Sequence, residues 1–280
     1  MTETTSSAVA ERATVATRII RDAGQLALAY FRRYRSLAVE TKSGQQDIVS
    51  EADRQVETLI REALITSFPE DGLVGEEHGV QKGTSGFTWL IDPIDGTSPF
   101  LHGLRTWCVV LALIEKNRPV AGLIYDPSAD ELFVAVLGQG ATMNGAPITV
   151  DQSSTLQQGL TAISAVVEVP GAQIAGMIER LHDLGGAYIR LGSAALTLAY
   201  VAAGRLVGYF ERQLHSWDCV AGLLIVKEAG GTVSVFPLAD GPLEIGPAYA
   251  ASPTVHNPLA NLIQAQVFEL APLEVSSSGY

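Results

Sequence analysis

Two aspartates near residue 92 stand where a predicted strand passes into a predicted helix. Asp92 and Asp95 are three residues apart, follow a run of bulky apolar residues and precede Gly96 and Thr97. Thr97 or Ser98 can cap a helix that has a proline in its first turn. Carboxylate, carbonyl and hydroxyl oxygens are the ligands that Mg²⁺ prefers, and a helix N-terminus beside them offers N–H groups to an anion. The pattern predicts a phosphate ester held by a metal, with an ordinary turn as the structural alternative.

Four other segments carry acids or phosphate-binding groups at the ends of predicted elements. They are Lys42-x4-Asp47-Ile48-Val49-Ser50-x2-Asp53, Gly75-Glu76-Glu77-His78-Gly79, Arg190-Leu191-Gly192-Ser193-Ala194-Ala195 and Glu211-x6-Asp218. Each allows a purely structural interpretation: Asp53 can complete a capping box with Ser50, the glutamates can belong to a solvated loop, Arg190 can be a surface charge at a strand end, and Asp218 can complement a helix dipole. Because all of these acids fall at element ends, where loops carry function, we expect them to form one site.

The charge of the chain limits its partners. Its 280 residues have a net charge of −12, and direct nucleic-acid binding is not expected because that needs a positive face. Clustered carboxylates would also repel a phosphate ester unless a bound cation reversed the local charge. An anionic substrate, here a small phosphorylated metabolite, therefore requires a metal. The five histidines share no metal-ligand spacing, so we expect them to be structural or surface residues.

Nothing in the sequence indicates a membrane or an oxidising compartment. The longest apolar run, Cys108–Ile114, is too short to span a bilayer, and the polar N-terminus resembles no secretory signal. Cys108 and Cys219 provide no disulfide framework and lie in apolar surroundings. We therefore expect both cysteines to pack in the core and the protein to be cytoplasmic.

Two helices and an antiparallel sheet must position the first acids. Apolar residues recur at helical spacing over 9–34, and Ser50 can cap a second helix that ends before Phe68. Strands are predicted at Trp107–Ile114, Val120–Tyr125, Glu131–Val136, Ala141–Asn144 and Pro147–Val150, with turns at Lys116–Arg118 and Asn144–Gly145. The polar segment 151–155 marks a boundary. We therefore divide the chain into an N-terminal part, 1–150, with most of the candidate metal ligands, and a C-terminal α/β part, 151–280.

Strands and helices alternate in the C-terminal part, which predicts an α/β layer. The strands are Leu160–Val166, Ala187–Arg190, Leu206–Phe210 and Thr232–Val235, and the helices are Ala172–Leu184, Ala194–Ala203 and Trp217–Ala229. Residues Glu274–Tyr280 are expected to form an exposed tail.

The order of the motifs resembles the inositol monophosphatase family. The matching motifs are Asp47-Ile-Val-Ser-x-Ala-Asp53, Gly75-Glu76-Glu77, Trp89-x-Ile-Asp92-Pro-Ile-Asp95-Gly-Thr97, Trp217-Asp218-x4-Leu and Glu228-Ala-Gly-Gly231. The resemblance covers about Thr14 to Ser252, and the run Gly192–Gly204 is similar to the bacterial branch. It implies an α/β (α+β) fold, built as a layered α/β/α/β/α sandwich, and a Mg²⁺-dependent, Li⁺-sensitive phosphatase.

The resemblance also implies roles for the matched residues. Glu76, Asp92, the carbonyl of Ile94, Thr97, Asp95 and Asp218 would bind two or three Mg²⁺ ions. Thr97 paired with Asp53 would activate the attacking water, and Glu76 would assist catalysis by placing a third ion. The substrate would contact Asp95, Gly96, Thr97, Gly192, Ser193, Ala194, Glu211 and Lys42. A homodimer is the expected assembly.

The substrate and the functional class have alternatives. Inositol monophosphate is the first expected substrate, and histidinol phosphate, another sugar phosphate or a 3′-phosphonucleotide are the alternatives. Many family members continue Thr-Asn-Phe after the motif, but here Pro99 follows Ser98 and removes one N–H from the anion-facing turn. Haloacid-dehalogenase phosphatases use an Asp-x-Asp-Gly-Thr motif, which the three-residue spacing here does not match. Some bacterial relatives act instead as RNA-polymerase-associated regulatory factors.

Overall fold

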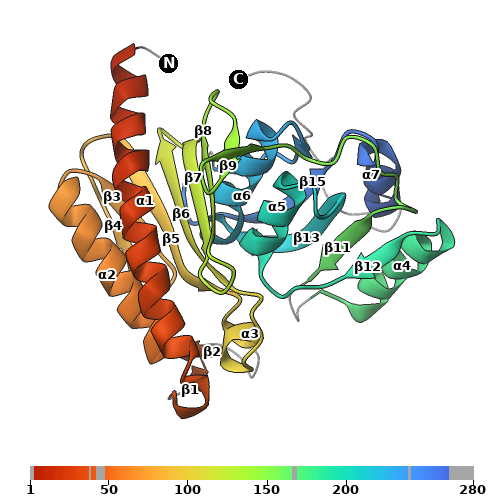
Figure 1. Cartoon of the computed structure of the whole chain (residues 1–280), viewed down its shortest axis with the longest axis horizontal. Helices are drawn as coiled ribbons and strands as arrows, with labels where there is room; N and C mark the ends of the chain where they lie inside the picture. Colours follow the sequence, from red (N-terminus) through yellow and green to blue (C-terminus); the bar gives the residue numbers. More distant parts are fainter. Residues whose placement is uncertain (1–2, 38, 42–47, 166–168, 239–240, 265–280) are drawn as a thin grey trace.

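The computed structural model describes residues 3–37, 39–41, 48–165, 169–238 and 241–264. Figure 1 shows the two large β-sheets, with helices outside them and between them. The layers follow the order α/β/α/β/α, so the predicted fold class is confirmed. None of the described helices is long and apolar enough to cross a membrane. Lys42, Asp47 and the predicted tail Glu274–Tyr280 lie outside the described residues.

Helices α1 (Glu3–Phe31) and α2 (Glu51–Ser67) form the first layer. Their apolar residues at helical spacing, among them Ala16, Ile20 and Ile60, are buried against the first sheet. Helix α1 begins earlier than the predicted residue 9, because no glycine or proline interrupts the polar residues before it. It also ends before residue 34, and a short 3₁₀ helix, η1 (Tyr34–Ser36), follows.

All the strands of the first sheet come from the N-terminal part of the chain. Its strands are β3 (Gly72–Gly75), β4 (Gly79–Gln81), β5 (Phe87–Asp95), β6 (Cys108–Glu115), β7 (Arg118–Asp126), β8 (Glu131–Val136), β9 (Ala141–Met143) and β10 (Ala146–Ile148). Their order is β10-β9-β8-β7-β6-β5-β3-β4. All neighbours are antiparallel except β3 and β5, which are parallel. Lys116, Asn117 and Asn144 have positive φ, which confirms the two predicted tight turns.

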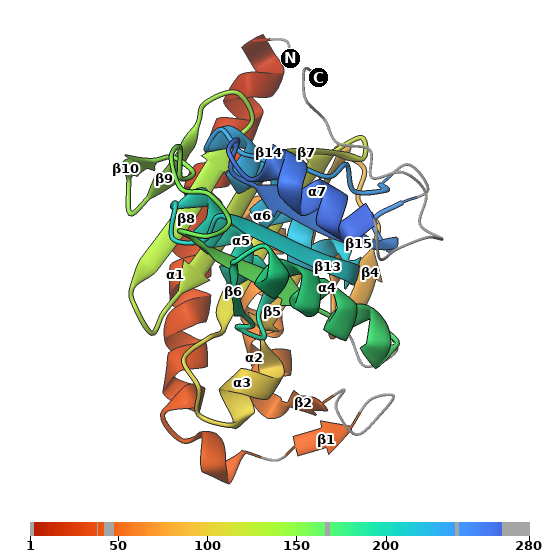
Figure 2. The ribbon, with the colours of Figure 1, turned by 90° about the vertical axis from the view of Figure 1, so that its right-hand side faces the viewer.

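The second sheet contains strands of the C-terminal half. They are β11 (Leu160–Ser164), β12 (Ala187–Ile189), β13 (Gly208–His215), β14 (Thr232–Val233) and β15 (Ile245–Ala251), in the order β12-β11-β13-β15-β14. Helices α4 (Gly171–Asp183) and α7 (His256–Gln264) cover its outer face (Figure 2). A separate antiparallel pair, β1 (Val39–Thr41) and β2 (Ile48–Ser50), precedes α2. The sequence had predicted neither β15 nor α7.

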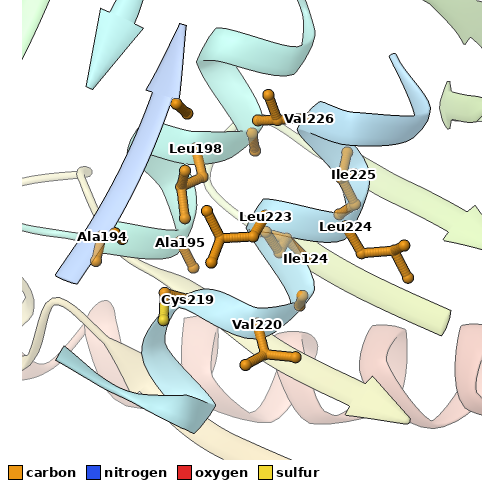
Figure 3. Close-up of a cluster of buried hydrophobic side chains, with 14 of the residues drawn as sticks. Ile124, Ala194, Ala195, Leu198, Cys219, Val220, Leu223, Leu224, Ile225 and Val226 are labelled. Atoms are coloured by element: carbon orange, nitrogen blue, oxygen red, sulfur yellow. The ribbon is translucent and has the colours of Figure 1, made fainter. Parts of the chain in front are cut away.

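Helices α5 (Ala194–Ala202) and α6 (Ser216–Glu228) fill the space between the two sheets. Figure 3 shows their apolar side chains, such as Leu198, Val220 and Leu223, gathered in one core with a residue of β7. The packing is close: a Cβ atom on Gly122 would lie 2.6 Å from the carbonyl oxygen of Ala221. Helix α6 is therefore held firmly against the first sheet, and its N-terminus has a defined position.

Candidate active site

A bulge at the end of β5 orients the two aspartates of the central motif. Asp92 pairs with Val110 of β6 and Asp95 pairs with Cys108, so three steps along β5 match two steps along β6. Side chains three residues apart on a regular strand point to opposite faces, and the extra residue of a bulge removes this conflict. Pro93, which has no N–H, is tolerated at such an interruption. Both carboxylates are buried, with 2% and 8% of their residue surfaces exposed.

Gly96 turns the chain from β5 into the short helix α3 (Thr97–Leu101). Its φ is +94°, and its carbonyl accepts a hydrogen bond from the N–H of Phe100 at 3.0 Å. A Cβ atom at this position would lie 2.8 Å from the carbonyl oxygen of Thr106, so only glycine fits. The predicted cap at Thr97 or Ser98 is wrong. Gly96 is the N-cap without a side-chain bond, because its left-handed backbone makes the turn.

Thr97 faces Asp53, which lies in the first turn of α2. The Asp53 Oδ2 atom accepts hydrogen bonds from the N–H and the hydroxyl of Ser50, at 2.9 and 2.7 Å. The predicted capping box is therefore confirmed. The other oxygen, Oδ1, lies 3.3 Å from the Thr97 hydroxyl, whose alternative acceptor is the carbonyl of Ile94 at 3.2 Å. One carboxylate thus caps a helix and faces the site.

Glu76 and Asp218 reach the same place from other elements. The parallel pairing of β3 and β5 aligns Gly75 with Ile91, and the Glu76 N–H donates to the Ile91 carbonyl at 3.3 Å. Glu76 therefore follows β3 beside Asp92. Asp218 lies in the first turn of α6, where its Oδ2 atom accepts from the His215 N–H at 2.9 Å. Its predicted place at a helix start is confirmed.

The pKa values of these acids show that they are close enough to repel each other. Burial, followed by the charges of Glu76, Asp95 and Asp218, raises the pKa of Asp92 well above its ordinary range. Burial, followed by the charges of Glu76 and Asp95, does the same to the pKa of Asp218. A neighbouring cation would favour the ionised forms instead. The arrangement is electrostatically costly for the protein alone and suited to a divalent cation.

The donor chemistry of the cluster fits Mg²⁺. Every candidate ligand is an oxygen atom: four carboxylates, the carbonyl of Ile94 and the hydroxyl of Thr97. Within the described ranges, no three His, Cys, Asp or Glu side chains converge in the arrangement of a bound metal ion. The chemistry of these oxygen donors, rather than a preformed coordination geometry, is what fits a Mg²⁺ ion.

The N-terminus of α5 holds the Asp95 carboxylate. Asp95 Oδ2 accepts from the Ser193 hydroxyl at 2.5 Å and from the Ala195 N–H at 2.7 Å, and Oδ1 accepts from the Ala194 N–H at 3.3 Å. Ser193 also caps the helix, as predicted, by accepting from the Leu196 N–H. Burial raises the pKa of Asp95, and the hydrogen bonds act in the opposite direction because they favour the charged form. This contact joins the two halves of the chain at the site.

Glu211 lies on β13, at the edge of the same neighbourhood. The pairing of β11 with β13 places it opposite Ser164, and the Tyr209 hydroxyl donates to its Oε2 atom at 2.5 Å. Burial raises the pKa of Glu211, while the bonds from Tyr209 and Ser164 lower it. The charge of Glu211 also raises the pKa of Asp218. Glu211 thus faces the acids from the second sheet.

The structure brings the described candidates together, and it adds residues that the sequence had not indicated. Gly192, with a φ of +84°, lies against the ring of Pro99 and links α3 to the turn before α5. Cys108 was expected only in the core, but its thiol lies 3.8 Å from Asp95 Oδ2 and 3.6 Å from the Ser193 hydroxyl. Tyr209 was not predicted as a residue of the site. The available signal was its position two residues before Glu211, because residues two apart on a strand lie on the same face. Lys42 lies outside the described residues.

The fold and this acidic site define a layered α/β protein whose helix N-termini meet a carboxylate cluster. Residues 8–266 match the model of the inositol monophosphatase family. The chain belongs to this family.

Individual relatives agree with this assignment. The chain is 38% identical to the Nus factor SuhB of Haemophilus influenzae, over 89% of this chain and 94% of that protein. It is 36% identical to an inositol-1-monophosphatase of Rhizobium meliloti, over 88% and 93% of the two chains. The solved inositol monophosphatase TM1415 of Thermotoga maritima superposes with a TM-score of 0.81, at 30% identity, over 93% of this chain and all of that one. An IMPase/NADP phosphatase solved with Mg²⁺ and phosphate shares the fold, with a TM-score of 0.75 at 22% identity over 90% of this chain and 95% of that one.

Proposed function

We propose that this chain hydrolyses a small phosphate monoester with Mg²⁺, and that inositol monophosphate is its first candidate substrate. One observation carries the proposal: the buried Asp92 and Asp95 and the half-buried Glu76 and Asp218 lie close enough for their charges to raise the pKa of Asp92, and the N-termini of α5 and α6 meet this cluster. Such a cluster calls for cations, and helix N-termini favour an anion. A phosphate ester bound with divalent cations satisfies both.

The Asp53–Thr97 pair is suited to activate water. Since Ser50 holds the Asp53 carboxylate through Oδ2, the Oδ1 atom remains directed at the Thr97 hydroxyl. When Thr97 donates its proton to Asp53, its own lone pairs can accept a proton from a water molecule on the other side. A water proton can then pass toward Asp53 as the water attacks phosphorus, and no protein nucleophile is needed.

Residues of both halves would hold the metal and the phosphate. Mg²⁺, when bound, supplies the positive charge that activates water and stabilises the leaving oxygen. Glu76, Asp92, Asp95 and Asp218 would hold it, with the Ile94 carbonyl and the Thr97 hydroxyl. The N–H groups of Gly96 and Thr97 begin a helix and need partners outside it, so they can receive phosphate oxygens. Pro99 offers no N–H there, which limits what can be inferred about the substrate from relatives.

A panel of phosphate monoesters tests the proposal. The kcat/KM values for inositol monophosphate, histidinol phosphate, a sugar phosphate and a 3′-phosphonucleotide would be compared with Mg²⁺ present. We expect hydrolysis that excess chelator abolishes, that added Mg²⁺ restores and that Li⁺ inhibits. Turnover at full rate in excess chelator would refute the metal mechanism. Light scattering on the purified protein tests the homodimer that we propose as its assembly.

A second candidate function comes from the 38% identity to a protein named Nus factor SuhB. In that case the chain would bind the transcription machinery, with or without hydrolysis. Purified RNA polymerase passed over the immobilised chain tests this function separately from activity. Binding that survives Asp53→Asn would show that the two functions are independent, and absence of binding would remove the regulatory candidate.

A further inference from the structure

A second buried carboxylate lies one helical turn after Asp53 on α2. Glu57 has no exposed surface. Its Oε2 atom accepts from the Glu77 N–H at 2.7 Å, and its Oε1 atom accepts from the His78 N–H at 3.2 Å and from Arg61 Nε at 2.6 Å. The two backbone donors belong to the turn between β3 and β4, directly after Glu76. Glu57 therefore binds the backbone of the turn that carries a candidate metal ligand.

Both ends of this turn are adapted to the contact. A Cβ atom on Gly75 would lie 2.0 Å from Glu57 Oε1, so glycine is what allows the backbone to approach the carboxylate. At the other end, the Nη2 atom of Arg61 donates to the carbonyl of Gly79. Gly79 has a φ of +64°, which suits the last position of a short hairpin turn. Glu57 and Arg61 together fasten residues 75–79 to α2.

Glu57 has more hydrogen-bond partners than an ion pair with Arg61 would provide. A buried carboxylate needs partners for its lone pairs, and Arg61 alone could provide a charge. Here two further donors come from the backbone of one turn, and on the other side of that turn the Glu76 N–H bonds to Ile91, the residue before Asp92. The backbone of Glu76 is thus held between β5 and α2.

We propose that Glu57, with Arg61, is a positioning residue that sets the divalent-cation affinity of the site by fixing the Glu76 turn. Glu57 follows Asp53 by four positions, which is about one helical turn and a rise of about 6 Å on the same face. A single helix therefore aligns the water-activating pair with a metal ligand. Both oxygens of Glu57 are bonded to Arg61 and to the backbone of the turn, so Glu57 would act through Glu76 rather than on the metal or the substrate. The inference rests on the proposed Mg²⁺-dependent function.

Glu57→Gln is the direct test. A glutamine has one acceptor oxygen and an NH₂ group, so it cannot satisfy the three donors that surround Glu57. Titration calorimetry on the substrate-free protein would measure the Mg²⁺ dissociation constant, and hydrogen exchange would measure protection of the Glu77 and His78 N–H groups. We expect affinity to fall by about 10-fold to 100-fold and both N–H groups to exchange faster. Saturating Mg²⁺ should restore kcat, because Glu57 does not act on the substrate.

The chain offers a matched control at the other end of β3. Asp71 is also buried, and it accepts from Arg12 Nε at 2.8 Å and from the Trp89 indole at 3.0 Å. Asp71→Asn should lower the melting temperature through the same kind of loss, but leave Mg²⁺ affinity and the protection of the Glu76 turn as in the wild type. A purely structural role for Glu57 would make the two variants behave alike.

A second variant keeps the test decisive if Glu57→Gln does not fold. Arg61→Lys retains a charge beside Glu57, but an ammonium group cannot also reach the Gly79 carbonyl in the fork geometry of arginine. It should weaken Mg²⁺ binding in the same direction, to a smaller extent. Wild-type Mg²⁺ affinity and unchanged exchange in a folded variant would overturn the proposal. If the wild type binds no Mg²⁺, the proposed function fails, and unchanged exchange in the variant would then separately overturn the positioning role.

Discussion

Asp53→Asn tests whether the carboxylate of Asp53 both caps α2 and accepts a proton through Thr97. In the wild type, Oδ2 accepts from both donors of Ser50 and Oδ1 faces the Thr97 hydroxyl at 3.3 Å. The amide of Asp53→Asn has a single acceptor oxygen, and the two donors of Ser50 hold it on their side. The NH₂ group then faces Thr97 and donates to the oxygen that should accept a proton from water. The cap remains while the path for the proton is lost.

Asp53→Asn should reduce stability only slightly and kcat strongly. Because the cap is retained, the free energy of unfolding should fall by about 1 kcal/mol or less. The value of kcat should fall by about 10²-fold or more, since general-base catalysis contributes on the order of 10² to 10⁴. The KM should change little, because Asp53 acts in the transition state rather than in substrate binding.

Variants of the two neighbours distinguish the roles. Ser50→Ala removes the cap, which costs about 1 kcal/mol, and should reduce kcat far less than Asp53→Asn does. Thr97→Val keeps the shape of the side chain and removes a hydroxyl that is also a proposed Mg²⁺ ligand, so it should reduce kcat at least as much as Asp53→Asn does. The double variant of Asp53 and Thr97 should be no slower than Thr97→Val alone, because residues that act as a unit are not additive.

Steady-state kinetics at saturating Mg²⁺ and urea unfolding of each variant provide the measurements. The decisive comparison is kcat for Asp53→Asn against the wild type. A kcat within about twofold of the wild type would refute the catalytic pair and leave Asp53 with its capping role alone. Fully multiplied losses in the double variant would show that the two residues act separately.

Three other substitutions test the surrounding structure. Gly96→Ala forces a non-glycine residue to a φ of +94° beside the Thr106 carbonyl; it should cost about 1–2 kcal/mol, measured by thermal unfolding, and lower activity. Burial raises the pKa of Asp126, so the stability that its protonation contributes is complete at low pH and is lost as pH rises through the folded-state pKa. Melting curves should show Asp126→Asn gaining on the wild type as pH rises from acidic to neutral. Glu211→Gln should change the ranking of hydroxyl-bearing phosphate esters and leave p-nitrophenyl phosphate hydrolysis almost untouched; equal losses on both would assign Glu211 to the fold.

The sequence allowed correct prediction of several helix caps and turns that a local rule decides. Ser50 and Ser193 cap helices because a hydroxyl followed by helix-forming residues satisfies the first N–H groups. The turn at Asn144–Gly145 forms because both residues accept positive φ. The five layers followed from a family resemblance rather than from periodicity. The helix cap beside Asp95 was wrong, because the left-handed backbone of Gly96 made a side-chain cap unnecessary.

Contacts that depend on strand register were beyond local rules. Glu76 lies beside Asp92 because β3 pairs in parallel with β5, and β3 has only four residues, two of them glycines. Glu57 and Arg61 form an i,i+4 pair that is typical of a solvated helix surface. Only the packing of the Glu76 turn against α2 shows that this pair is buried. Nothing in the spacing distinguishes the two cases.

Asp53, Asp95 and Asp218 each bind backbone N–H groups at the start of a helix and also belong to the candidate site. Asp53 and Asp218 each accept, with one oxygen, from the backbone N–H three residues earlier, and Asp95 accepts from the first N–H groups of α5. Helix N-termini carry partial positive charge, which offsets part of the repulsion among buried carboxylates. Three helix starts can therefore hold three acids near one another before any cation binds. Capping would orient the carboxylates for the proposed chemistry, and the motifs that predicted the site are for this reason also motifs that start helices.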